Sequence, residues 1–63
     1  MRLLTIEEVA TMLRKSPGQL RWMIHQGSAP ASAKIGGRRL FREKDCVAYV
    51  NAAFAAPSST GDK

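Results

Sequence analysis

Two helix-start signals follow one another closely in the sequence, and they limit the fold more than any other feature. In TIEE, Thr5 and Glu8 have the spacing of a capping box, in which both side chains bind free amides of a helix's first turn. In SPGQ, Ser16 is placed as a helix cap, Pro17 takes the first helical position and Gln19 completes a second box. The sequence therefore predicts two short helices joined by a tight connection.

Apolar spacing sets the extent of these two helices. The first is predicted from about Ile6 to Arg14, and the second ends at Gly27, a natural left-handed cap. A connection of two or three residues forces the helices to cross sharply, which is the helix-turn-helix layout. The predicted inner-face residues are Ile6, Val9, Ala10 and Leu13 in the first helix and Leu20, Met23 and Ile24 in the second.

The stretch KIGGRRLF predicts a tight β-hairpin. Two short β segments, at about Ala33–Ile35 and Arg39–Phe41, flank Gly36 and Gly37, which tolerate the positive φ of such a turn. A phosphate-binding loop would instead run into a helix, normally with a lysine followed by serine or threonine. Another β segment follows these glycines, so the hairpin interpretation is favoured.

A third helix is predicted from about Glu43 to Phe54. Residues 1–56 are expected to form one domain, and residues 57–63, PSSTGDK, a disordered tail. The predicted fold is mostly α with a small β-hairpin: a winged helix-turn-helix in the order helix, helix, β wing, helix. The residues predicted to share one face of the third helix are Cys46, Tyr49, Val50 and Phe54.

Positive charge is concentrated in the middle of the chain, which carries a net charge of +5. No acidic residue lies between Glu8 and Glu43. Such a block attracts a polyanion, which can be nucleic acid, an acidic membrane surface or an acidic protein. The basic residues of this block are Arg14, Lys15, Arg21, Lys34, Arg38, Arg39 and Arg42.

Other residue types exclude several classes of function. Cys46 is the only cysteine and His25 the only histidine, so neither an internal disulfide nor a cysteine and histidine zinc site is expected. We interpret Cys46 as a core residue and His25 as a surface residue. No catalytic constellation is present, so we expect no enzyme activity, cofactor or metal. Without a signal peptide or a membrane-spanning apolar run, we expect a soluble cytoplasmic protein.

The chain resembles the short winged helix-turn-helix proteins of the excisionase type, relatives of MerR-like DNA-binding domains. The resemblance runs from Leu3 to about Asn51 and rests on LTIEEVA, SPGQLRWMI, the exit from Gly27 to Pro30, KIGG and REKDCVAYV. It implies an excisionase, or recombination directionality factor, of a temperate phage or integrated element. It further implies that several copies bind double-stranded attachment-site DNA cooperatively, head to tail, bend it and assist a tyrosine-type integrase.

Two other functions remain open at this stage. The same module serves AlpA-like regulators and other small transcription factors, so a transcriptional regulator is one alternative. The other is an adaptor that holds a protein partner through the wing or the third helix and has little affinity for DNA. Weak salt dependence of any DNA binding would distinguish the adaptor, because phosphate contacts make binding steeply salt-dependent.

If the second helix lies in the major groove, its first turn and outward face meet the DNA. Gln19 then pairs with adenine or stays a helix cap, and Arg21 binds guanine or phosphate or stays solvated. Trp22 either donates its indole N–H to a phosphate or packs in the core. The predicted recognition-helix residues are Ser16, Pro17, Gly18, Gln19, Arg21 and Trp22.

The hairpin would act as a wing that enters or flanks the adjacent minor groove, where narrow A·T-rich segments favour arginine. The predicted wing residues are Gly37, Arg38 and Arg39, and the pattern leaves open whether Arg39 points inward or outward. Arginines that merely keep the turn soluble are the alternative. The predicted phosphate contacts are Arg14, Lys15, Lys34 and Arg42.

Overall fold

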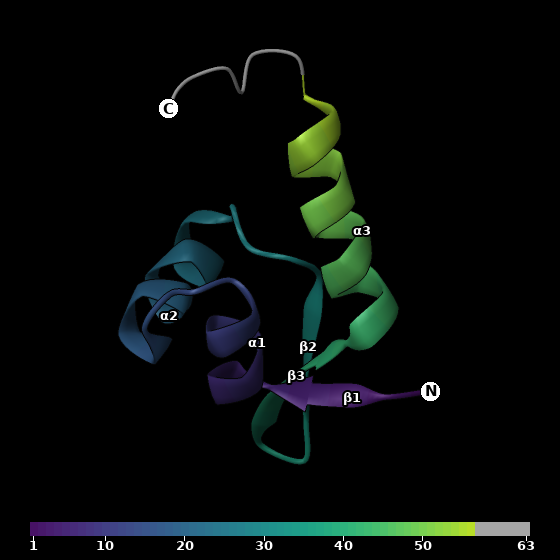
Figure 1. Ribbon diagram of the computed structural model, residues 1–63. Helices are drawn as coiled ribbons and strands as arrows, with labels where there is room; N and C mark the ends of the chain where they lie inside the picture. The colour runs from purple at the N-terminus through teal and green to yellow at the C-terminus, as the bar shows by residue number, and fades with distance from the viewer. Residues whose placement is uncertain (57–63) are drawn as a thin grey trace.

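The predicted winged helix-turn-helix architecture is confirmed. A computed structural model describes residues 1–56, which form three helices and a three-stranded antiparallel sheet (Figure 1). The predicted tail, residues 57–63, lies outside the described residues. The elements are β1 (Leu3–Thr5), α1 (Ile6–Met12), α2 (Pro17–Gln26), β2 (Ser32–Ile35), β3 (Arg38–Arg42) and α3 (Glu43–Ala55).

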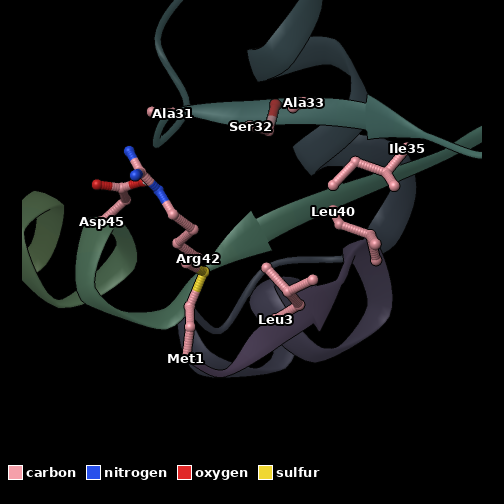
Figure 2. Close-up of a pocket in the computed structure, with 9 residues that line it drawn as sticks. All are labelled: Met1, Leu3, Ala31, Ser32, Ala33, Ile35, Leu40, Arg42 and Asp45. Atoms are coloured by element: carbon pink, nitrogen blue, oxygen red, sulfur yellow. The ribbon is translucent and has the colours of Figure 1, made fainter.

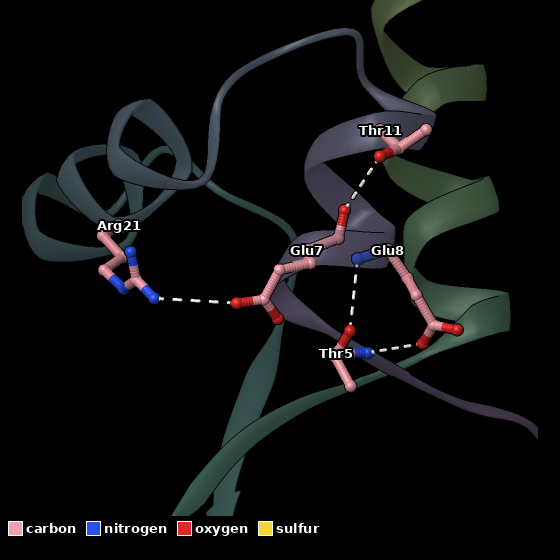
Figure 3. Close-up of polar contacts among 5 residues, drawn as sticks. All are labelled: Thr5, Glu7, Glu8, Thr11 and Arg21. Carbon is pink, nitrogen blue, oxygen red and sulfur yellow. Dashed lines mark hydrogen bonds and ion pairs between the residues drawn. The ribbon is translucent and has the colours of Figure 1, made fainter.

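Side-chain caps start the first two helices where the sequence predicts. The Thr5 backbone N–H donates to Glu8 Oε1 at 2.9 Å, and Thr5 Oγ1 accepts from the Glu8 N–H at 3.2 Å (Figure 3). Ser16 Oγ accepts from the Gln19 N–H at 3.1 Å. The second box is only half formed, because among residues 1–56 the Gln19 side chain makes no hydrogen bond back to Ser16.

Helix α1 ends earlier than predicted, because the chain must turn to place the cap of α2. Arg14 lies outside the helix in the left-handed region, with φ of 60°. The Lys15 N–H donates to the Ala10 carbonyl at 2.8 Å and the Arg14 N–H to that of Thr11 at 3.1 Å. These two bonds form a Schellman motif, which satisfies helix-end carbonyls at the cost of a strained non-glycine residue.

The sheet has one strand that the sequence did not predict. Strand β1 pairs with β3, which lies in the centre of the sheet between β1 and β2, and Leu4 is the partner of Phe41. Three residues are too few to show strand alternation, so β1 arises from its pairing rather than from a local pattern. The hairpin is as predicted in position, and Gly36 and Gly37 have φ of 59° and 82°, as a type I′ turn requires.

Every helix and two of the strands contribute to one small core. Its buried residues are Leu4, Val9, Ala10, Leu20, Phe41 and Cys46. Leu20 therefore anchors α2 from its inner side, and Phe41 anchors the wing. This packing leaves the outward side of α2 and the hairpin turn free to meet a partner.

Helix α3 extends beyond the core, so Phe54, one of the residues predicted to share a face of this helix, is not a core residue. Phe54 is 85% exposed because the last turns of α3 project past the sheet (Figure 1). Lower in the helix, the Tyr49 hydroxyl donates to the Ser28 carbonyl at 2.9 Å and ties α3 to the chain after α2. Cys46 is a buried core residue as predicted, and burial, with Asp45 and Glu43 nearby, raises the pKa of its thiol.

Candidate nucleic-acid interface

A polar cleft of about 280 Å³ lies where α2, the start of α1 and the wing meet. It brings together Arg21 of the predicted recognition helix with Arg38 and Arg39 of the predicted wing. The complete lining is Thr5, Ile6, Glu7, Arg21, Gly37, Arg38 and Arg39. Residues far apart in the sequence thus form one predominantly cationic surface, which is the electrostatic character that a phosphate backbone requires.

The first turn of α2 presents an open surface to solvent. Ser16 Oγ is occupied as the helix cap, and Pro17 is half-buried. Gly18 has nothing within 4 Å of the position that a Cβ would take. The exposed Gln19 side chain makes no hydrogen bond within residues 1–56, so its amide is available to a base edge. Because Gly18 has no side chain, it allows the helix to approach a ligand closely beside Gln19.

Trp22 lies on the outward side of α2 and is 62% exposed. Core packing, one of the two alternatives for this residue, is therefore excluded. Among the described residues its indole N–H has no hydrogen-bond partner, which leaves the predicted phosphate contact open. A tryptophan this exposed, one helical position beyond Arg21, is typical of a binding surface.

Replacing Trp22 with alanine is expected to lower affinity for duplex DNA about tenfold, the effect of one hydrogen bond to a charged group. The fold should persist, because Trp22 makes no contribution to the buried core. Anisotropy of a labelled duplex measures the affinity, and circular dichroism measures the melting temperature. Trp22→Phe is the control, since it keeps an aromatic ring, although a smaller one, and removes the N–H. Wild-type affinity in both variants would remove Trp22 from the interface.

The wing carries its two arginines in different environments. Arg38 is exposed beside the turn, whereas Arg39 is half-buried and its Nη1 donates to Ser32 Oγ at 2.8 Å across the hairpin. Alternation along β3 places Arg39 on the same face as the buried Phe41. The open question of its direction is thus answered: Arg39 lies on the inner face, and Ser32 holds its guanidinium at the cleft.

The predicted phosphate-binding residues lie at three separate places. Arg14 and Lys15 are exposed on the turn between α1 and α2, and Lys34 is exposed on β2 as the pairing partner of Arg39. Arg42 lies elsewhere: its Nε donates to Asp45 Oδ2 at 2.6 Å, on the outer face of the sheet (Figure 2). This bond joins β3 to the first turn of α3, so the Arg42 guanidinium has a partner within the protein that competes with phosphate.

The cleft also contains an acidic residue that sequence reasoning missed. Glu7 Oε2 lies 3.9 Å from Arg21 Nη2, and the two side chains face each other from α1 and α2 (Figure 3). The sequence shows Glu7 only as an acidic residue in a helix's first turn, next to the capping Glu8. Its position beside the wing depends on the unpredicted pairing of β1 with β3.

Two other features, a metal-binding cluster and a membrane-spanning helix, are absent from residues 1–56. No group of three or more histidine, cysteine, aspartate or glutamate side chains is placed to hold a metal ion within this range. None of the helices described is both long and apolar enough to cross a bilayer. Within residues 1–56, the cationic cleft is the feature that best indicates a function.

Comparison with known proteins identifies a family for this chain. A family model described as a helix-turn-helix domain matches residues 3–53. No curated protein and no solved structure matches the chain. The family match covers β1 through most of α3, including α2, the wing and the cleft between them. Because the match spans most of the sequence, this chain belongs to the helix-turn-helix domain family and is a DNA-binding protein.

Proposed function

We propose that this protein is an excisionase, a recombination directionality factor that binds attachment-site DNA and has no catalytic activity of its own. In this proposal several copies bind neighbouring sites, bend the DNA and help a tyrosine-type integrase to excise an integrated element. The resemblance of LTIEEVA, SPGQLRWMI and KIGG to excisionase-type proteins supports this role. We expect the protein to be bound to DNA in the cytoplasm of its host cell.

One observation carries the DNA-binding part of the proposal: Arg21, Arg38 and Arg39 line the same cleft. With α2 in the major groove, the hairpin would follow the backbone toward the adjacent minor groove, where arginine is favoured. The exposed Gln19 and Trp22 extend the same surface along α2. Arginines on both α2 and the wing favour a bound orientation in which the helix and the wing contact DNA together.

Cooperative binding has its own physical support. A single module of this size makes too few contacts for high specificity, so neighbouring copies would supply the rest of the binding energy. Among residues 1–56, the exposed apolar side chains include Phe54 on α3 and, on the outer sheet face, Leu3 and Ile35 (Figure 2). Contact between two different patches produces head-to-tail rows rather than closed dimers.

The experiment is a gel-shift titration of tiled fragments from the source replicon, covering the attachment region and the promoters. A ladder of complexes on the attachment fragment, with little binding to promoters, is expected. A single discrete shift at a promoter would instead indicate a transcriptional regulator. Absence of any shift would contradict DNA binding and favour the protein-interaction adaptor.

The same titration at 50 and 200 mM salt tests the phosphate contacts. With four or five cations on phosphates, affinity should fall by roughly two to three decades between these concentrations. The count excludes Arg42, whose guanidinium is held by Asp45. An affinity that hardly changes would contradict a backbone-binding interface, whatever fragment is bound.

A further inference from the structure

We propose that Glu7 is a specificity-determining residue, which holds Arg21 for base recognition and lowers binding to DNA of arbitrary sequence. The inference rests on the proposed binding of duplex DNA at the cleft. It assigns a role to a residue that the helix-turn-helix pattern does not mark. Glu7 acts through Arg21, so it is a positioning residue rather than a base-reading one.

The geometry places Glu7 among the cations that would meet DNA. Of the described residues that line the cleft, Glu7 is the one that is acidic, and Arg21, Arg38 and Arg39 line the same cleft. Its Oε2 lies 3.9 Å from Arg21 Nη2. The exposed fractions of the two side chains are 66% for Glu7 and 59% for Arg21, so both remain within reach of a ligand.

A carboxylate in this position has opposite effects on two kinds of DNA contact. It repels phosphate, and it competes with phosphate for Arg21, so it weakens contacts that any sequence can offer. The guanidinium carries five N–H donors in a fixed fork, and the nitrogen that lies 3.9 Å from Glu7 Oε2 is Nη2. The remaining donors can still bind the O6 and N7 of a guanine. Glu7 therefore favours base contact over phosphate contact by Arg21.

The strength of the pair suits this role. An exposed ion pair at such a distance contributes only about 0 to 1 kcal/mol, so Arg21 can still move to meet a base while Glu7 stays beside it. A much stronger pair would keep Arg21 from the DNA altogether. The weak pair shifts Arg21 away from phosphate and toward bases. Its effect should be greatest on DNA that lacks the recognised base, where Arg21 can contact only phosphates.

The test is Glu7→Gln, which keeps the shape of the side chain and removes its charge. Affinity for a random-sequence duplex of about 20 base pairs should rise about fivefold at 50 mM salt, which corresponds to about 1 kcal/mol. The slope of log K against log salt should steepen by about 0.9, because Arg21 gains one phosphate contact. Selection from a randomised duplex library should then yield a weaker sequence preference than the wild type gives.

Glu43→Gln is a closely matched control. Glu43 also lies in the first turn of a helix and also faces an arginine at long distance, with Arg2 Nε 4.0 Å from its Oε2. The control removes the same charge and the same interaction with a helix dipole, but Glu43 does not line the cleft. Circular dichroism melts of both variants show that each remains folded at the temperature of the binding assay.

A double-mutant cycle with Arg21→Gln separates positioning from net charge. In the Arg21→Gln background, Glu7→Gln should change the salt slope and the selected sequences little, since its partner is gone. Equal effects of Glu7→Gln and Glu43→Gln, or an unchanged effect in the Arg21→Gln background, would overturn the inference while leaving the proposed function intact. Failure of the wild type to bind any duplex would instead overturn both.

Discussion

Replacing Leu20 with alanine is expected to unfold much of the protein population at ambient temperature. Leu20 is fully buried and is the residue of α2 at the centre of the core. Truncating a buried leucine costs about 2 to 5 kcal/mol, because it removes transfer free energy and leaves a cavity. A chain of 63 residues has a total stability at the low end of the usual range, so this loss is comparable to the whole.

Thermal melts followed by circular dichroism measure the loss of stability. Two other truncations serve as comparisons for its size. Ile24→Ala should cost less than Leu20→Ala, because Ile24 is only half-buried against the core. Phe54→Ala should leave the melting temperature nearly unchanged, since that ring is almost fully in solvent. A Leu20→Ala variant that melts cooperatively within a few degrees of the wild type would contradict the assignment of the inner face of α2.

Replacing both Arg38 and Arg39 with alanine is expected to lower affinity for duplex DNA about a hundredfold. Each arginine at such an interface contributes about 1 to 3 kcal/mol, and the two line one cleft. Arg39 should contribute more per residue than Arg38, because its bond to Ser32 already orders the guanidinium and less entropy is lost on binding. The fold should remain, since neither residue belongs to the buried core.

The double variant Arg2→Ala, Lys44→Ala controls for net charge, since it removes two cations that do not line the cleft. Its affinity, measured by duplex anisotropy at a fixed salt concentration, should fall far less than that of the wing variant. Equal losses in the two double variants would mean that only total charge matters. Such a result would exclude the wing from the interface even though binding itself persisted.

The sequence predicted the parts of the fold that local chemistry determines. Caps at Thr5 and Ser16 start helices because each side chain satisfies an amide within three residues, a contact that the sequence spacing specifies completely. Gly36 and Gly37 form the predicted turn because few other residues tolerate their φ values. The cationic block in the sequence also indicated a cationic surface, and three of its arginines line the cleft.

What the sequence did not predict depends on contacts between distant segments. Strand β1 exists because Leu4 pairs with Phe41, and no local pattern in three residues indicates this. Glu7 reaches the wing only through that pairing. Phe54 fits the periodicity of α3, but periodicity does not show how far along a helix the core extends. The bond between Arg42 and Asp45 likewise depends on where β3 ends and α3 begins.

The most direct test of the interface is an amide NMR titration of the folded protein with a duplex of about 20 base pairs. Chemical-shift changes should concentrate in the first turn of α2 and at the wing, where Gly18, Gln19 and Arg38 are the reporters. The amides of Leu3, Val47 and Phe54, on the outer sheet face and α3, should shift little at low protein-to-duplex ratios. Changes confined to those three amides, with the cleft unaffected, would contradict the account.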